Sequence, residues 1–330
     1  MQHKTITNFI KQFEEDVYKG LTDFPKHLSS KYFYDERGDR LFQQIMHMPE
    51  YYLTDCEFDI LTHHKEQIIQ WFEKGSADIN LIELGAGDGK KTKILLEHMV
   101  NRNLQFKYTP IDISQNALHK LERSIEQELP DVEVATRQGT YFEVLQHLST
   151  LNGSKKVILF LGSNIGNLLH ADAVEFLGKL QKVMTEDDLL LIGFDQKKNP
   201  QTVLNAYNDP AGITEDFNKN ILLRINKELS GNFVLENFLH WEVYDPETGT
   251  AKSYLVSKKE QTVSIDALGL KVVFKPWETI HTEISQKYDD EIVNWLAGKA
   301  GLSVEAVFST QNQAYKNYIF KKRKNESNLE

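Results

Sequence analysis

The sequence has only one cysteine, Cys56, in 330 residues. A lone cysteine excludes an intrachain disulfide, and nothing beside it predicts an activated nucleophile, so we expect a packing role. The first residues lack the apolar run of a secretory signal, and no stretch reaches the roughly 18 to 20 consecutive apolar residues that span a bilayer. These absences predict a soluble protein of the reducing cytoplasm, with no membrane partner.

Basic residues are in the minority, with 38 lysines and arginines against 48 acidic residues and a net charge of -10. The sequence lacks the basic stripe that follows a phosphate backbone, which argues against a nucleic-acid partner. The 11 histidines show no metal-ligand spacing, since only His63 and His64 are adjacent, so we predict no metal site. A small-molecule partner is the remaining expectation.

From residue 79 the sequence alternates short apolar runs with helical stretches. Strands are predicted over 79–84, 106–112, 132–137, 157–161 and 189–194, and helices over 90–100, 114–129 and 171–184. This alternation is typical of a parallel sheet whose strands are joined by crossover helices. The sequence therefore predicts an α/β fold with five strands in this part of the chain.

After Asp195 the rhythm changes to loops, a helix and alternating strands. A helix is predicted over 214–226, strands over 233–244 and 252–256, a turn at 245–249, and then a helix over 289–300 with strands over 303–309 and 315–320. The last two strands suit an antiparallel edge pair that closes the first sheet. We therefore expect two discontinuous domains, an inserted α+β domain of residues 1–58 with 195–285, and a sheet domain of residues 59–194 with 286–330.

A glycine-rich segment follows the first predicted strand and begins a helix. It includes Gly85, preceded by the acidic Glu83, and its glycines allow a tight turn and close approach of a ligand to the backbone. A dinucleotide enzyme uses the same device. The second strand, however, ends at Asp112, which can accept hydrogen bonds from both hydroxyls of an adenosine ribose, and a polar loop over 161–167 stands where a second nucleotide-binding half would be. These features favour S-adenosylmethionine as the ligand. A nearby carboxylate such as Glu83 is expected to attract its positive charge.

Several longer segments carry a family resemblance. They are residues 31–38, 41–42, 49–52, 162–167, 206–209 and 283–288. With them the chain resembles the histidine-specific Nα-methyltransferases of ergothioneine biosynthesis from about Lys31 to Phe320. The resemblance implies a Rossmann-like class I methyltransferase sheet with an inserted α+β substrate-binding domain.

The resemblance also implies site residues. For the donor they are Gly85, Lys91, Asp112, Thr140 and Tyr141, and for the substrate they are Tyr51, Asn167, Tyr207, Glu283 and Ser285, with Tyr34 as a catalytic proton relay. Relatives typically carry Asp-Phe where this chain has Thr140 and Tyr141, so an aspartate that would hold the adenine amino group is replaced by threonine.

The implied substrate residues suit the chemistry of histidine. Asn167 and Tyr207 are expected to grip the amino-acid head with Tyr51 nearby, whereas Glu283 and Ser285 can read the two imidazole nitrogens. Other roles exist for the same residues: the tyrosines as packing aromatics, Asn167 as a cap of the following segment, and Glu283 as a solvated strand residue paired with Lys287.

The resulting hypothesis is an S-adenosylmethionine-dependent enzyme that methylates the α-amine of L-histidine up to three times, as a monomer. The alternatives are a methyltransferase that acts on a histidine ring nitrogen or on another amino acid such as tryptophan, a dinucleotide-dependent oxidoreductase, and a binding protein without turnover.

Overall fold

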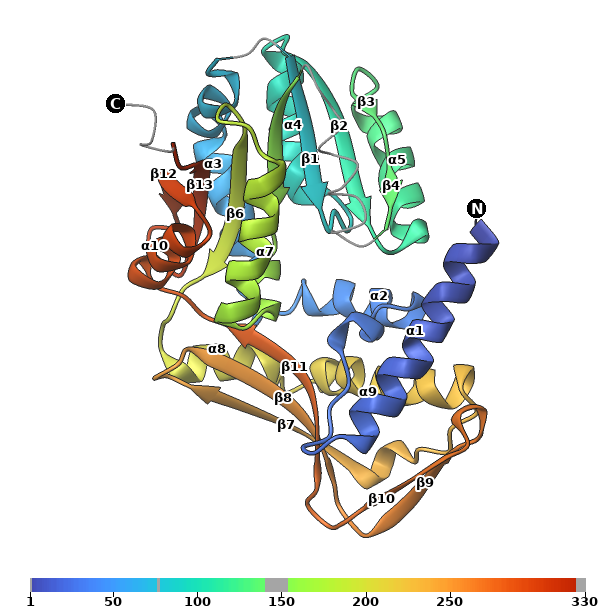
Figure 1. Ribbon diagram of the computed structural model, residues 1–330. Coiled ribbons are helices and arrows are strands. Elements are labelled where there is room, and N and C mark those ends of the chain that lie inside the picture. Colours follow the sequence, from blue (N-terminus) through green and yellow to red (C-terminus); the bar gives the residue numbers. More distant parts are fainter. Residues whose placement is uncertain (1, 76–77, 140–153, 325–330) are drawn as a thin grey trace, which may run out of the picture. The chain divides into compact units, whose positions relative to one another are not determined.

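The structure, a computed structural model, describes residues 2–75, 78–139 and 154–324 (Figure 1). The chain divides into two compact units. We call residues 1–52 with 198–285 the inserted unit, and residues 53–197 with 286–330 the sheet unit. The first crossing between them is predicted at residue 58 and lies instead before Leu53, because α3 (Leu53–Glu73) is one continuous helix.

The sheet unit contains a mostly parallel sheet. Its strands are β1 (Asp78–Leu84), β2 (Gln105–Asp112), β3 (Glu133–Val134), β4 (Arg137–Gln138), β5 (Lys155–Phe160), β6 (Leu189–Asp195), β12 (Leu302–Ser309) and β13 (Tyr315–Lys322). Their order is β12-β13-β6-β5-β1-β2-β3, with β4 also paired to β2. β13 is antiparallel to both β6 and β12. The predicted α/β class and the antiparallel edge pair are confirmed, whereas the single strand expected over 132–137 is two short strands.

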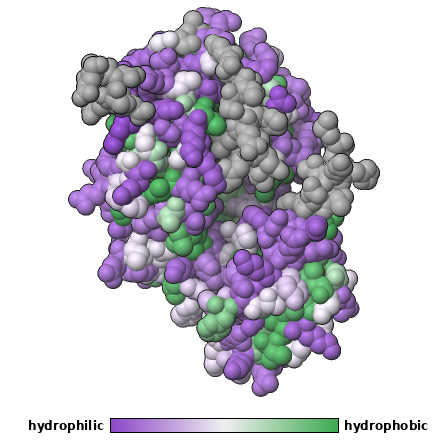
Figure 2. Space-filling model, viewed as in Figure 1, coloured by the Kyte–Doolittle hydropathy of each residue, from purple (hydrophilic) through white to green (hydrophobic). Residues whose placement is uncertain are grey.

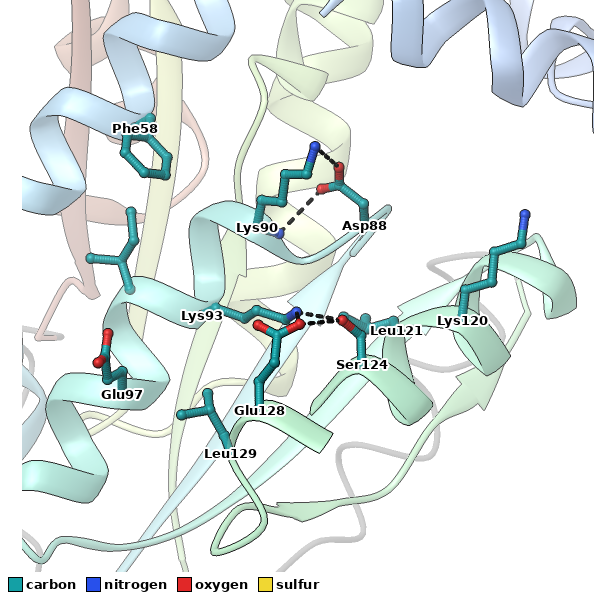
Figure 3. Close-up of a pocket in the computed structure, with 11 residues that line it drawn as sticks. Phe58, Asp88, Lys90, Lys93, Glu97, Lys120, Leu121, Ser124, Glu128 and Leu129 are labelled. Carbon is teal, nitrogen blue, oxygen red and sulfur yellow. Dashed lines mark hydrogen bonds and ion pairs between the residues drawn. The ribbon is translucent and has the colours of Figure 1, made fainter. Parts of the chain in front are cut away.

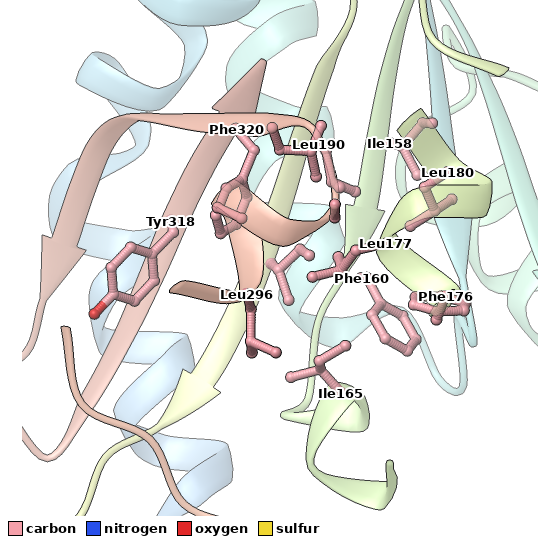
Figure 4. Packing of buried hydrophobic residues seen from close by; sticks show 14 of the residues in the cluster. Ile158, Phe160, Ile165, Phe176, Leu177, Leu180, Leu190, Leu296, Tyr318 and Phe320 are labelled. Atoms are coloured by element: carbon pink, nitrogen blue, oxygen red, sulfur yellow. The ribbon is translucent and has the colours of Figure 1, made fainter. Parts of the chain in front are cut away.

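Helices cover both faces of this sheet. Besides α3 they are α4 (Lys90–Asn101), α5 (Gln115–Glu128), α7 (His170–Val183) and α10 (Asp290–Lys299), with the 3-10 turn η2 (Asn164–Asn167) after β5. Side chains alternate along a strand, so Ile158 and Phe160 of β5 pack with Leu177 of α7 and Leu296 of α10 in one core (Figure 4). In β1, Ile82 and Leu84 belong to the same core. Glu83 between them points to the opposite face of the sheet, toward α4.

The inserted unit combines helices with antiparallel strands. Its elements are α1 (Gln2–Thr22), η1 (Ser30–Phe33), α2 (Glu36–Ile45), α8 (Pro200–Tyr207), α9 (Ile213–Glu228), η3 (Leu235–Asn237), β7 (Phe238–Asp245), β8 (Thr250–Ser257), β9 (Gln261–Ile265), η4 (Asp266–Leu268), β10 (Leu270–Phe274) and β11 (Thr279–Gln286). The predicted turn joins β7 to β8, where Gly249 N–H donates to Asp245 O at 2.8 Å. The strand predicted from residue 233 begins only at Phe238, because η3 occupies the residues before it.

A polar network fixes the conformation of residues 31–38, one of the segments that carry the family resemblance. The Asp35 carboxylate caps α2 by accepting from Gly38 N–H at 2.8 Å, and it also accepts from Asn220 of α9 at 2.8 Å. A Cβ on Gly38 would lie 1.8 Å from Phe33 O, so only glycine fits there. These contacts fix the chain around Tyr34 against α9.

The visible surface is mostly polar, with apolar side chains in small separate groups (Figure 2). Trp277, 68% exposed, is one of the large apolar side chains that reach solvent. No helix within the described ranges combines the length and the apolar character needed to cross a membrane.

His240 of β7 gives the inserted unit a testable pH dependence. The side chain is buried, and burial lowers its pKa to about 4. In the unfolded chain the pKa of a histidine is about 6.5. Between pH 4 and pH 6.5, roughly, the unfolded state therefore binds more protons at His240 than the folded state does. The free energy of unfolding should therefore fall as the pH drops, by about 2 kcal/mol from pH 7 to pH 5 for this group.

Urea unfolding of the wild type and His240→Gln at both pH values measures this contribution. The free energy of unfolding of the wild type minus that of His240→Gln should be about 2 kcal/mol smaller at pH 5 than at pH 7, because glutamine does not titrate. Parallel pH dependences would mean that His240 keeps an ordinary pKa in the folded protein.

Candidate active site

The glycine-rich segment forms the turn between β1 and α4. Gly85, Gly87 and Gly89 have φ values of 74°, 54° and 67°, a region that favours glycine. A Cβ on Gly89 would lie 2.2 Å from the Leu121 side chain, whereas one on Gly87 would meet nothing within 4 Å. The backbone at Gly87 is thus open to close approach, at the N-terminus of α4.

Asp112 lies at the end of β2, beside this turn. Its carboxylate accepts from Gly87 N–H at 3.1 Å and from Ser114 N–H at 2.9 Å. Burial raises the pKa of Asp112, and these backbone hydrogen bonds oppose that rise. A carboxylate has about four acceptor sites, so the backbone hydrogen bonds leave acceptor capacity at Asp112 for a ribose hydroxyl.

The turn lies at a topological switch point. From β1 the chain continues to β2 on one side, and its later strand β5 pairs on the other side of β1. In open α/β sheets the crevice outside the carboxyl ends of the strands at such a point is where ligands bind. Gly85 after β1 and Gly162 after β5 therefore flank the expected position of a ligand.

Glu83 has a different role from the one expected. The side chain is 3% exposed and accepts hydrogen bonds from Thr92 of α4, at 2.6 Å, and from Tyr108 of β2. Burial raises its pKa to about 7, against the effect of both hydrogen bonds. Glu83 therefore fastens α4 to the sheet, and its oxygens face this buried contact.

Lys91, predicted at the donor site, forms an ion pair with a residue that the sequence does not single out. Its ammonium lies 2.6 Å from Glu57 Oε2 of α3, and its side chain is 20% exposed. The same oxygen accepts from Gly162 N–H at 2.7 Å. Glu57 thus links the helix after β1 to the loop after β5.

Further contacts fix the loop after β5. Ser163 has a φ of 56°, its hydroxyl accepts from Asp195 N–H at 3.2 Å, and the Tyr288 hydroxyl donates to Ile165 O at 3.0 Å. Asn167 is exposed at the end of η2. It does not cap α7, whose N-cap residue is Leu169.

In the inserted unit the structure brings four predicted residues into one cluster. The Tyr207 and Ser285 hydroxyls are hydrogen-bonded at 2.6 Å, and both residues are 7% exposed. The Tyr51 ring meets the Tyr207 ring edge to face at 6.3 Å between centroids. Phe42 connects the Tyr51 ring to that of Tyr34, at 6.4 and 5.6 Å. The tyrosines are thus packing aromatics, and together with Phe42 they form a continuous row of ring contacts.

Glu283 lies two residues before Ser285 on β11, partly exposed. Lys287, its partner in the alternative role, has its ammonium 2.8 Å from Asp195, and the side chains of Lys287 and Asp195 are both fully buried. Thr140 and Tyr141 lie outside the described residues. Among the described residues there is no group of three or more His, Cys, Asp or Glu side chains that could hold a metal ion.

A cavity of about 610 Å³ lies between α4 and α5 of the sheet unit, and Asp88 of the glycine turn is among the residues that line it (Figure 3). Its charged residues include Lys93, which bonds to Ser124 at 2.5 Å and Glu128 at 2.8 Å, and Lys90, which pairs with Asp88 at 3.5 Å. Because these groups pair with one another, we assign no ligand to this cavity.

Comparisons with known proteins agree with this arrangement. Residues 13–322 match a family described as "Histidine-specific methyltransferase, SAM-dependent". The "Histidine N-alpha-methyltransferase" of Mycolicibacterium smegmatis is 37% identical over 287 residues, which cover 87% of this chain and 88% of that protein. The protein of the same name from Mycobacterium tuberculosis is 34% identical with the same coverage.

A longer relative matches as well. "Ergothioneine biosynthesis protein 1" of Schizosaccharomyces pombe is 32% identical over 304 residues, which cover 90% of this chain and 39% of that protein. The similarity to these three proteins thus extends across both units of the chain.

Proposed function

This chain belongs to the family of S-adenosylmethionine-dependent, histidine-specific methyltransferases, and from that premise we infer that it methylates the α-amine of L-histidine. The observation that carries the inference is the 37% identity to a histidine N-alpha-methyltransferase over 87% of this chain. The product would enter ergothioneine biosynthesis, the process for which the Schizosaccharomyces pombe relative is named.

The residues of the switch point fit an adenosine-containing cation. Asp112 has acceptor capacity for a ribose, and the open backbone at Gly87 accommodates close approach. Lys91 offers an ammonium for the carboxylate of the donor's amino-acid end. We propose Thr140 and Tyr141 as contacts of the adenine, and this assignment rests on the family resemblance.

For the substrate we propose that Glu283 and Ser285 bind the imidazole and that Asn167, Tyr51 and Tyr207 hold the amino-acid head. The hydrogen bond between Tyr207 and Ser285 supports this assignment, because it joins a residue of each set. A carboxylate and a hydroxyl together can accept from or donate to both imidazole nitrogens. This set disfavours tryptophan, whose indole has a single donor and no acceptor.

When bound, S-adenosylmethionine supplies an activated methyl group on a sulfonium. The protein's own contribution is then to align the α-amine with that carbon and to present its lone pair. An α-amine is mostly protonated at neutral pH, so its proton must leave first. We propose Tyr34 as the residue that relays this proton, and no dedicated strong base.

The row of aromatic rings favours repeated methylation. Each methyl group moves the amine toward a quaternary ammonium, which tyrosine faces bind by cation–π attraction. The rings follow one another in the order Tyr34, Phe42, Tyr51 and Tyr207, each in contact with the next. We therefore propose up to three rounds, which give the trimethylated betaine.

We further propose that the enzyme acts as a monomer in the reducing cytoplasm. A single cysteine suits a reducing compartment. A dinucleotide-dependent oxidoreductase is disfavoured, because β6 is followed in the sheet by the antiparallel β13 and not by a second parallel half.

A substrate panel tests the proposal. The purified chain is incubated with S-adenosylmethionine and each of the twenty amino acids, and products are read by mass spectrometry. We expect gains of one, two and three methyl groups on histidine and none on phenylalanine, which lacks the groups that Glu283 and Ser285 bind. Equal methylation of tryptophan, or binding of the donor without any S-adenosylhomocysteine, would contradict the proposed activity.

A further inference from the structure

A fully buried carboxylate at the switch point, that of Glu57, has no role in the function proposed so far. We propose that Glu57 is a positioning residue for the donor, which holds Lys91 and the Gly162 peptide where they receive the donor's amino-acid end. This inference rests on the proposed function, because it assumes that S-adenosylmethionine binds at the switch point.

Glu57 gathers hydrogen bonds from three parts of the sheet unit. Its Oε2 accepts from the Lys91 ammonium at 2.6 Å and from Gly162 N–H at 2.7 Å. Its Oε1 accepts from the Tyr315 hydroxyl at 3.1 Å and from the Asn317 amide at 3.0 Å, both on β13. The side of the carboxylate that faces β13 therefore anchors Glu57, and the other side holds the two groups at the switch point.

The sheet is built around this side chain. A Cβ on Gly193 of β6 would lie 2.0 Å from Glu57 Oε1, so the glycine makes room for the carboxylate. Burying a charge costs free energy, and well-packed apolar residues in place of a buried ion pair are often as stable or more stable. Fold stability alone is therefore a weak reason for a carboxylate at this position.

The two groups held by Oε2 lie on opposite sides of the switch point. Lys91 is in the first turn of α4, after the glycine turn, and Gly162 follows β5. An ammonium carries three N–H groups, and the bond to Glu57 uses one of them. In a planar trans peptide the C=O points opposite to the N–H, so Leu161 O points away from Glu57.

The expected consequence concerns one end of the donor only. Lys91 is suited to the carboxylate of a bound amino acid, and Leu161 O, which points away from Glu57, is the kind of acceptor that suits its ammonium. Loss of the Glu57 charge should release both groups and weaken ligands that carry this amino-acid end. Ligands that consist of adenosine without it should be unaffected.

Two probes separate these cases in the full-length protein. S-adenosylhomocysteine carries the amino-acid end, whereas methylthioadenosine lacks it. For Glu57→Gln we expect the Kd of S-adenosylhomocysteine to rise at least about tenfold, with the Kd of methylthioadenosine within about twofold of wild type. The KM for S-adenosylmethionine should rise in parallel, with the KM for histidine unchanged.

The matched control is another buried ion pair of the same unit. Lys156 and Asp188 lie 2.9 Å apart with side chains 6% and 1% exposed, at the amino ends of β5 and β6. Asp188→Asn removes a comparable buried charge and should leave both Kd values unchanged. Should Glu57→Gln not fold, Glu57→Asp keeps the charge and shortens the side chain, and it should weaken S-adenosylhomocysteine alone by at least about threefold.

The outcomes are distinct. Equal loss of both probes in the Glu57 variants, no loss of either, or the same selective loss in Asp188→Asn would overturn the positioning role. A wild-type chain that binds neither probe would instead overturn the proposed function, and the positioning role with it.

Discussion

Replacing Glu283 by alanine is expected to lower kcat/KM for histidine by at least about 100-fold, with the Kd of S-adenosylmethionine changed less than about twofold. Glu283 is the only charged group proposed at the imidazole of the substrate. In the alanine variant one imidazole nitrogen of the bound histidine therefore loses its hydrogen-bond partner. Glu283 belongs to β11 of the inserted unit, whereas the proposed donor residues belong to the sheet unit. Initial rates and donor titration by calorimetry measure the two quantities.

Two further variants make this result specific. Glu283→Gln keeps the size and one acceptor, so its loss should be smaller than that of alanine. Glu260→Ala removes an exposed glutamate of the same unit and should leave kcat/KM unchanged. A Glu283→Ala protein that loses donor affinity as severely as histidine turnover would refute the substrate assignment.

Replacing Asp112 by alanine should weaken donor binding at least about 100-fold, because hydrogen bonds to a charged acceptor contribute about 1.5 to 3 kcal/mol each. The effect differs from that at Glu57. Asp112 is assigned to the ribose, which S-adenosylhomocysteine and methylthioadenosine share, so both should lose affinity by similar factors. Competition binding with the two compounds measures this.

Asp112 also accepts from Gly87 and Ser114 N–H groups, so Asp112→Asn is the milder companion variant. It retains an acceptor for the turn and should lose less affinity than the alanine variant. Asp131→Ala, at an exposed position of the same unit, is the control and should bind both compounds normally. Unchanged affinity of Asp112→Ala for methylthioadenosine would remove Asp112 from the ribose site.

The parallel sheet was predictable because its signals are local. β5 contains an apolar run over residues 157–160 and is buried along its whole length. The glycine turn follows directly after β1, and Asp112 is the last residue of β2. The position of Asp112 beside that turn also follows from parallel pairing, since the carboxyl ends of neighbouring strands share one edge. The prediction failed where strands are very short, as in β3 and β4.

Glu57 was not predictable from the pattern of α3. A helix is expected to bury its apolar residues and expose its charged ones, yet Phe58 is 46% exposed and Glu57 is fully buried. The partners that make this burial possible come from β13, α4 and the loop after β5, with sequence separations of up to 260 residues. Only the folded chain brings them together.

The substrate residues illustrate an intermediate case. No local pattern distinguishes Tyr51 and Tyr207 from ordinary packing tyrosines, and both do pack in an aromatic cluster. The family resemblance singled them out, and the structure adds the hydrogen bond from Tyr207 to Ser285 that connects α8 with β11. Such a pairing depends on tertiary packing and leaves no spacing signal in the sequence.

The position of the transferred methyl groups distinguishes methylation of the α-amine from methylation of the imidazole ring. Histidine is incubated with the enzyme and S-adenosylmethionine labelled with ¹³C in its methyl group, and the product is examined by long-range carbon–proton NMR. We predict that every labelled methyl group correlates with the α-carbon of the product and that the final species carries three equivalent methyl groups. A label that correlates with an imidazole carbon would contradict α-amine methylation.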